Sequence, residues 1–261
     1  MESDLLNAFR ECPAGSMDEA GVAALVARLI EPRQRIEDIE IGLDEVCMQC
    51  APDAAPWESL DRLGFAGNRD DYDALENSNL GWVLAQRRGI PITLAVVLIR
   101  VARRAGHRAV GVNFPGHFLV DVDGTLVDPF VMQAIDVDGF LQRLPLDARQ
   151  QSRSHLFAEA TPVAVGLRML NNVKAVYSRI ALWDRTLDVV DAQLALAPDQ
   201  PALHLERGEL WHRLGLVSPA RASYQRAIEL SEASPSEHGV LIRQAAQERL
   251  DELGGANDVL H

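Results

Sequence analysis

Apolar residues recur every three to four positions along most of the chain, which predicts a largely helical protein. A Ser-x-x-Glu capping signal at Ser16 and Glu19 begins the first such run, and Pro32 ends it. The pattern predicts four helices before residue 90, at 16–31, 36–49, 57–63 and 80–88. Between the last two lies GFAGNRDDYDALENSN, a polar segment rich in Gly and Asn that is typical of a well-structured loop.

In a central segment, the spacing of apolar residues changes from the period of a helix to the alternation of a strand. Gly89 closes one helix and Pro91 is placed to begin the next, whose apolar first half predicts burial on all sides. Gly106 ends this helix. The strings HRAVGVN and HFLVDV then predict strands, and Asp123-Gly124 predicts a two-residue hairpin turn into TLVD.

The hairpin turn fixes a register that brings two polar residues together. If Asp123 and Gly124 form the turn, Val122 lies opposite Thr125. Counting back along both strands then places Leu119 opposite Asp128. His117 lies on the same strand face as Leu119, so His117 and Asp128 are diagonal neighbours, roughly 7 Å apart in the backbone. An aspartate bonded to one imidazole nitrogen would fix the tautomer and leave the other nitrogen facing a substrate.

Three strings, GIPITLAVVLIRVARRAG, VGVNFPGHFLVDV and LVDPF, resemble the transglutaminase-like superfamily. Its bacterial SirB-one family is similar over nearly the full chain, including the GFAGNRDDY loop. The resemblance implies an α+β fold in which a cysteine opens the central helix, a histidine begins a strand and an aspartate lies on the next strand. These positions fall on Pro91, His117 and Asp128. Proline has neither a thiol nor a hydroxyl, so thioester chemistry cannot run at that position.

Other residues near this degenerate triad have weaker claims to a role. Thr93 lies in the first helical turn and could replace the nucleophile, although a hydroxyl in an apolar helix usually bonds to the backbone. His117 could equally be a structural residue that pins the hairpin. The candidates for lining a pocket are Asn68, Asn79, Asn113 and Phe114. Asparagines in Gly-rich loops more often stabilise turns.

Cys47 and Cys50 form an isolated C-x-x-C pair. A zinc site needs a second pair of ligands, and redox chemistry needs a thioredoxin-like strand context. The pattern therefore favours two small apolar residues at helical spacing. We expect neither a metal nor a cofactor.

The C-terminal part fits the tetratricopeptide template from Pro201 onwards. Its small and large positions are occupied in order by Gly208, Trp211, Gly215, Ala220, Tyr224 and Ala227. One period earlier the match is looser and rests on Leu170, Val173, Tyr177, Val190 and Pro198. Residues 237–252 supply a further or capping helix. Such repeats commonly present a groove to a peptide or helix, or they only complete the fold.

Composition narrows the classes of function. The 25 basic and 38 acidic residues give a formal charge of −13, which disfavours binding to nucleic acid and to anionic membranes. The longest apolar run, 92–99, is too short to span a bilayer, and three cysteines form no disulfide framework. We expect a cytoplasmic protein with a transglutaminase-like core at 1–160 and a tetratricopeptide-like region at 161–261.

Three hypotheses of function follow from these features. The leading one is a non-catalytic regulatory adaptor that binds another protein or a peptide through the helical region. The second is a hydrolase or acyl-transfer enzyme that uses His117 and Asp128 with a water molecule or Thr93. The third is a pocket for a small ligand or a peptide end, with His117 as a hydrogen-bond partner.

Overall fold

A computed structural model of the 261-residue chain describes residues 1–15, 17–114, 116–142, 156–233 and 236–255. The chain forms two compact units. One unit comprises residues 11–173, and the other comprises residues 1–10 together with 174–261. The expected division at residue 160 stays a prediction, because a compact unit and a functional domain need not share their boundaries.

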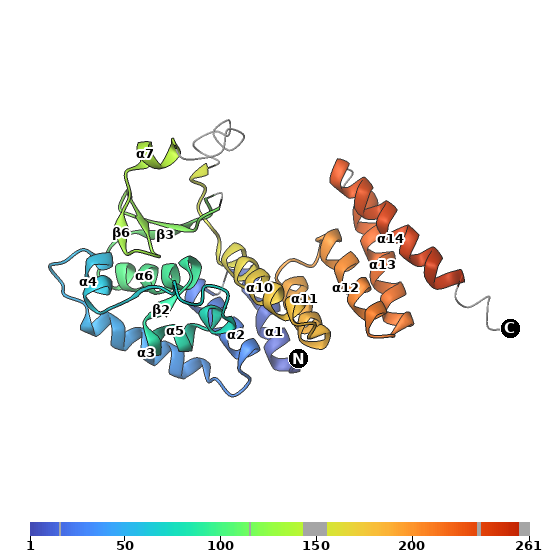
Figure 1. The fold of residues 1–261 in the computed structure, drawn as a ribbon, viewed down its shortest axis with the longest axis horizontal. Coiled ribbons are helices and arrows are strands. Elements are labelled where there is room, and N and C mark those ends of the chain that lie inside the picture. The colour runs from blue at the N-terminus through green and yellow to red at the C-terminus, as the bar shows by residue number, and fades with distance from the viewer. Residues whose placement is uncertain (16, 115, 143–155, 234–235, 256–261) are drawn as a thin grey trace. The chain divides into compact units, whose positions relative to one another are not determined.

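Helix α6 (Pro91–Arg104) is the centre of the unit formed by residues 11–173. Its first three turns are almost entirely buried, as the apolar run predicted. The helices around it are α2 (Glu19–Ile30), α3 (Ile36–Gln49), α4 (Pro56–Arg62) and α5 (Leu80–Gln86). Figure 1 shows α3 and α5 on one side of α6 and a small sheet on the other. Contact on both sides explains why α6 has almost no polar face before Arg100.

The sheet is antiparallel and has the strand order β3-β4-β5-β6. Its strands are β3 (Ala109–Val112), β4 (Leu119–Val122), β5 (Thr125–Asp128) and β6 (Gln133–Ala134). Val122 pairs with Thr125, which confirms the predicted register. The turn residues Asp123 and Gly124 have φ of 49° and 86°, the left-handed pair that an Asp-Gly hairpin turn requires. The α+β fold class is therefore confirmed.

The four predicted N-terminal helices are present, with differences at their ends. Helix α2 is capped by Asp18, whose Oδ1 accepts the Gly21 backbone N–H at 2.9 Å, while the predicted cap Ser16 lies outside the described residues. Helix α5 ends at Gln86 because Arg87 adopts φ of 57°. The next two residues instead form β2 (Arg88–Gly89), parallel to β1 (Ala66–Gly67).

Short elements complete this unit. They are the 3-10 helices η1 (Cys12–Ala14) and η2 (Leu75–Ser78), and helix α7 (Val137–Leu141). Helix α10 (Pro162–Arg179) begins in this unit and continues into the other. In the described part of the chain, no helix is long and apolar enough to cross a membrane.

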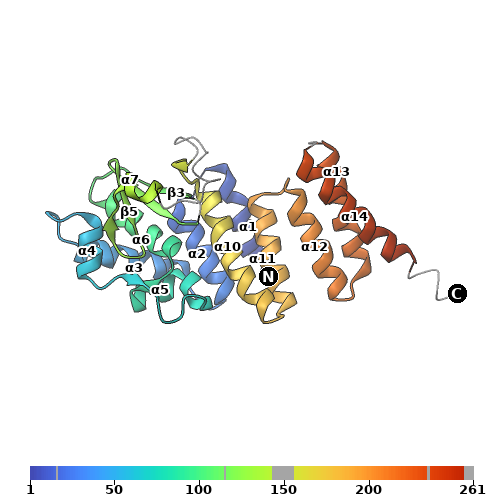
Figure 2. The same ribbon diagram turned by 45° about the horizontal axis from the view of Figure 1, so that its top comes forward.

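The second unit consists of stacked helices, as the repeat pattern predicted. They are α1 (Ser3–Glu11), α11 (Trp183–Leu196), α12 (Pro201–Arg213), α13 (Val217–Ala233) and α14 (Glu237–Gly255). Figures 1 and 2 show α12, α13 and α14 side by side. The Met1 ammonium group pairs with Asp188 at 2.6 Å, which fastens the start of the chain to α11.

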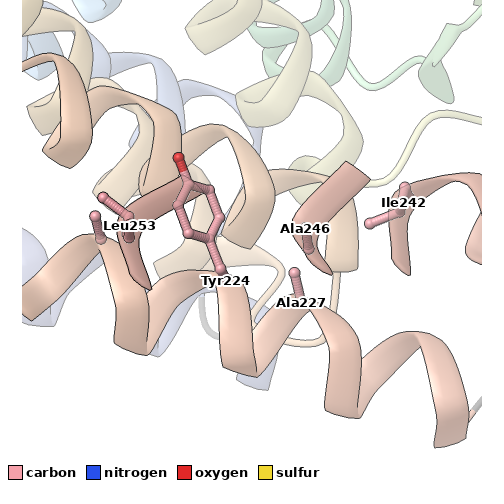
Figure 3. Packing of buried hydrophobic residues seen from close by; sticks show 6 residues of the cluster. Tyr224, Ala227, Ile242, Ala246 and Leu253 are labelled. Atoms are coloured by element: carbon pink, nitrogen blue, oxygen red, sulfur yellow. The ribbon is translucent and has the colours of Figure 1, made fainter. Parts of the chain in front are cut away.

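Tyr224 fills the core between these helices (Figure 3). Ala227 and Ala246 pack beside it and are fully buried, as Tyr224 is. A Cβ atom at Gly208 would lie 2.4 Å from the Tyr224 ring, so α12 approaches this ring more closely than a side chain allows. This contact explains the small residue and the large residue that the repeat pattern places at these two positions.

We predict that Gly208→Ala destabilises the protein by about 1–3 kcal/mol, because the added methyl group overpacks the Tyr224 contact. The matched control is Gly254→Ala in α14, where no described atom lies within 4 Å of the new Cβ. There the higher helix propensity of alanine should raise the free energy of unfolding by up to about 1 kcal/mol. Urea unfolding followed by circular dichroism measures both changes. Equal effects of the two substitutions would contradict the close packing of Gly208.

Candidate functional site

The first turn of α6 contains Pro91 and Thr93. Pro91 is half-buried and occupies the first helical position, where its missing N–H costs nothing. Thr93 is fully buried, and its Oγ1 accepts the Ile90 backbone N–H at 3.2 Å. The same oxygen lies 2.9 Å from the Asn77 carbonyl and 3.0 Å from the Ile90 carbonyl, either of which can accept its proton. The Thr93 hydroxyl thus bonds to the backbone.

Asn77 organises the polar loop that precedes α5. Its side chain is fully buried, and its amide nitrogen donates to the carbonyl groups of Asp71 at 2.7 Å and Tyr72 at 3.0 Å. Its Oδ1 accepts a hydrogen bond from Asn68 Nδ2 at 3.0 Å. Asn68 Oδ1 in turn accepts the Asp71 backbone N–H at 3.3 Å. The two asparagines therefore hold the loop backbone in one conformation, as Asn side chains commonly do in turns.

Gly67 joins this loop to the segment that follows β5. Its backbone N–H donates to the Phe130 carbonyl at 2.8 Å, and a Cβ atom at Gly67 would lie 2.2 Å from the Phe130 ring. Two loop side chains reach the same ring. The Tyr72 ring centroid lies 5.8 Å from the Phe130 ring centroid. The Arg69 guanidinium also lies 5.8 Å from the Phe130 ring centroid. The result is an aromatic pair with a cation beside it.

Asp128 and His117 lie at neighbouring strand ends. Asp128 is the last residue of β5, and its Oδ1 accepts the Phe130 backbone N–H at 2.8 Å. His117 is exposed, lies two residues before β4, and donates its backbone N–H to the Phe114 carbonyl at 3.0 Å. Their functional pairing stays a prediction.

Asn113 contacts an arginine that the sequence did not single out. Arg168 of α10 donates from Nη1 to Asn113 Oδ1, and its guanidinium lies 5.5 Å from the centre of the Phe118 ring. Burial lowers the pKa of Arg168, and the nearby Tyr72 side chain opposes this shift. Arg168 lies 55 residues after Asn113 along the chain, so only the tertiary fold brings the two together.

The two remaining pocket candidates have structural roles. Asn79 is buried and caps α5, because its Oδ1 accepts the Trp82 backbone N–H at 3.2 Å. Phe114 is fully buried in the core beneath the sheet, and its ring centroid lies 5.4 Å from that of Phe157. The structure thus brings Asn68 to Asn77 and Asn113 to Arg168, and it uses Asn79 and Phe114 as a cap and a core residue.

Cys47 and Cys50 are half-buried at the end of α3. Burial raises the pKa of both thiols, and Arg100 lowers that of Cys47 by a smaller amount. A raised pKa keeps a thiol protonated at neutral pH, which makes it a poor nucleophile. The environment thus matches that of small apolar residues.

The helical unit contains a cavity of about 320 Å³ lined by Glu209, His212, Arg213, Tyr224 and Arg249. The Tyr224 hydroxyl is buried at its wall without a hydrogen-bond partner in the described part of the chain, and burial raises the pKa of this group to about 12. The Arg213 guanidinium stacks 4.3 Å from the centre of a Trp183 ring. Arg249 pairs with Glu252 at 3.1 Å. The lining of this cavity therefore contains both polar and charged groups.

Comparison with known families agrees with this architecture. Residues 58–171 match the model of the transglutaminase-like superfamily, and residues 173–248 match a tetratricopeptide repeat model. The chain therefore combines a transglutaminase-like domain with a tetratricopeptide region.

Relatives occur in bacteria and in animals. A UPF0162 protein of Xylella fastidiosa is 38% identical over 198 residues, which cover 69% of this chain and 66% of that protein. A UPF0162 protein of Vibrio cholerae is 27% identical over 79% of this chain and 84% of its own length. Human F-box only protein 21 is 31% identical over 63% of this chain but only 28% of its own length. The chain thus spans about two thirds of the Xylella protein and a much smaller share of the human one.

We predict that Asn77→Ala lowers the free energy of unfolding by about 3 kcal/mol, because two backbone carbonyls and Asn68 lose their buried partner. Limited proteolysis should then cut the loop at 68–76 faster, and urea unfolding gives the loss of stability. Asn7→Ala is the control, because Asn7 is exposed and its Oδ1 accepts a hydrogen bond from the exposed Arg10 at 2.9 Å. Unchanged stability and protease resistance in Asn77→Ala would refute the role of this amide.

Proposed function

We propose that this protein is a non-catalytic, SirB-one-like regulatory adaptor that acts in the cytoplasm. The observation that carries the proposal is the first turn of α6. The resemblance assigns the nucleophile position to Pro91, and the nearby Thr93 hydroxyl is buried and bonded to the backbone. Neither residue provides an accessible nucleophile. The degenerate triad of His117 and Asp128 is then a remnant of the fold.

The helical region at 161–261 is proposed to bind the partner, a protein or a peptide. Its cavity is lined by Arg213, Arg249 and Glu209 and by the Tyr224 hydroxyl, which has no hydrogen-bond partner among the described residues. A buried hydroxyl without a partner costs free energy that a polar group of a ligand can restore. Charged side chains at the same place favour an extended segment that carries both polar and charged groups.

We predict that a protein captured from the source cell by the full chain is lost with the double variant His212→Ala/Arg213→Ala and retained with His117→Ala. The first variant alters the helical cavity, whereas the second alters the transglutaminase-like domain. Affinity capture with mass spectrometry measures this. Arg226→Ala is the control, because Arg226 lies on α13 outside the cavity lining. Loss of the partner with His117→Ala alone would indicate that the binding site lies in the transglutaminase-like domain.

We also predict that Thr93→Val lowers the free energy of unfolding by about 1–3 kcal/mol, because the Asn77 carbonyl and the Ile90 N–H lose their partner. Thr93→Ser keeps the hydroxyl and should cost less. Urea unfolding of both variants measures the difference. A hydrolytic or acyl-transfer activity that survives in Thr93→Ser but is abolished by Thr93→Val and by His117→Ala would favour the enzyme hypothesis instead.

A further inference from the structure

Helices α3 and α5 lie side by side and run in the same direction (Figure 1). Near their starts, a Cβ atom at Gly81 would lie 2.7 Å from Oε1 of Gln34, the residue two positions before α3. At their ends, Arg87 donates from Nη2 to Gln49 Oε1 at 3.2 Å. The two helices are therefore in contact from the start of α5 to its end.

A groove of about 380 Å³, the α3–α5 groove, runs between these helices. Its apolar lining includes Gly42 and Val46 of α3 and Leu84 of α5. Val46 is buried, whereas Leu84 is only half-buried. A Cβ atom at Gly42 would lie 3.2 Å from Leu84 Cδ1, so a larger residue at position 42 would crowd Leu84. Glycine at this position therefore keeps the groove open between the two helices.

Two acidic residues of α3, Asp38 and Glu45, also line the groove. Both are exposed, and in the described part of the chain neither forms an ion pair. Two other carboxylates of α3 are paired with the same arginine, because Glu40 lies 2.6 Å and Asp44 lies 3.9 Å from Arg100. The groove side of α3 thus carries two negative charges that the described residues do not neutralise.

Arg87 is the basic residue among those that line the groove. Its guanidinium is already bonded at the end of the groove, where it donates to the Leu63 carbonyl and to Gln49. Helix α5 itself has neither acidic nor basic residues. The charge along the rest of the groove therefore comes from Asp38 and Glu45.

Two large apolar side chains adjoin these acidic residues on α3. Ile41 is 57% exposed and Met48 is 78% exposed. The positions 38, 41, 45 and 48 follow one another at spacings of three, four and three residues, which places them in one stripe along the helix. A stripe with this spacing is typical of a surface that contacts another helix. Here acidic and apolar residues alternate along it.

We propose that the α3–α5 groove and the adjoining stripe of α3 bind a basic amphipathic helix of another protein. Seven residues of α-helix separate Asp38 from Glu45, about 10 Å along the axis. The matching partner helix carries two lysine or arginine residues seven positions apart and apolar residues that pack on Ile41 and Met48. A second copy of this chain would bring like charges together at Asp38 and Glu45, so charge complementarity favours a basic partner.

This contact goes beyond the adaptor function that we propose for the helical region. The groove lies within the unit formed by residues 11–173 and shares no residue with the cavity lined by Arg213. The formal charge of −13 on the whole chain also favours association with a basic partner over an acidic one.

A synthetic amphipathic helix of leucine, glutamine and alanine, with two lysines seven residues apart, tests the groove. Fluorescence anisotropy of the labelled peptide, titrated with the full chain, should show saturable binding that weakens as salt is added. ¹H–¹⁵N NMR should show shift changes at Gly42 and Gly81, which line the groove. Replacing the lysines by glutamates should weaken binding at least about tenfold, because like charges then meet at Asp38 and Glu45.

Variants of the acidic residues test the charge requirement. Asp38→Asn/Glu45→Gln should weaken binding of the lysine peptide about threefold to tenfold, because two exposed ion pairs are lost. The control is Glu58→Gln/Asp61→Asn, which removes two exposed carboxylates from α4 outside the groove lining. This control should leave binding unchanged. All four positions are exposed, and circular dichroism verifies that both variants are folded.

Variants of the apolar residues test the stripe. Ile41→Ser/Met48→Ser should weaken binding of the lysine peptide at least about tenfold, because the apolar area that the peptide buries is lost. The matched control is Leu241→Ser on α14, which removes an apolar side chain that is 63% exposed in the other unit. This substitution should leave binding unchanged.

Four results would overturn the proposal. They are the absence of saturable binding, equal binding of the lysine and glutamate peptides, unchanged binding in a folded Asp38→Asn/Glu45→Gln variant, and shift changes that leave Gly42 and Gly81 unaffected. Self-association of the unsubstituted chain in analytical ultracentrifugation that Ile41→Ser/Met48→Ser abolishes would assign the surface to a second copy instead. The adaptor function is tested separately, because the capture experiment depends on the cavity lined by Arg213.

Discussion

A buried hydrogen bond between the Thr93 hydroxyl and the Asn77 carbonyl connects the central helix to the polar loop. Both partners are fully buried, so neither could exchange this bond for water without opening the core. The Asn77 side-chain amide in turn donates to two carbonyl groups of the loop and so holds the loop backbone in place. The loop then places Arg69 and Tyr72 beside Phe130. The positions of Arg69 and Tyr72 thus depend on the first turn of α6.

The same bond gives the Thr93 hydroxyl at the start of α6 a structural role. A nucleophilic hydroxyl needs an aligned base and a path for a substrate. The Thr93 hydroxyl bonds to the backbone of Ile90 and Asn77 and is fully buried. Pro91 begins the helix without any reactive group. The first turn of α6 instead holds a loop in place.

Local patterns were sufficient to predict the hairpin and most of the helices. The Asp123-Gly124 turn requires two left-handed residues, a condition that few dipeptides meet, and the apolar run in α6 left no alternative to burial. Helix α1 was not predicted, because among its nine residues only Leu5 and Phe9 are buried. The strands β1, β2 and β6 have two residues each and therefore show no alternation.

Only part of the candidate site could be predicted from the sequence. The sequence named Asn68 and Asn113 but not Asn77. Asn77 and Asn79 are both asparagines in the same segment, and only their contacts in the fold show that Asn77 organises the loop whereas Asn79 caps a helix. Arg168 lies on a helix far from the hairpin in sequence, and no local pattern marks it as the arginine that contacts Asn113. Tertiary contacts of this kind require the fold.

The close approach of Gly67 to Phe130 has a consequence for how this surface can diverge among homologues. A side chain at position 67 would occupy the space of the ring, so the ring would have to leave or shrink. Loss of the ring would in turn remove the surface on which Arg69 and Tyr72 pack. A substitution that adds a side chain at position 67 should therefore be tolerated only together with a smaller residue at position 130.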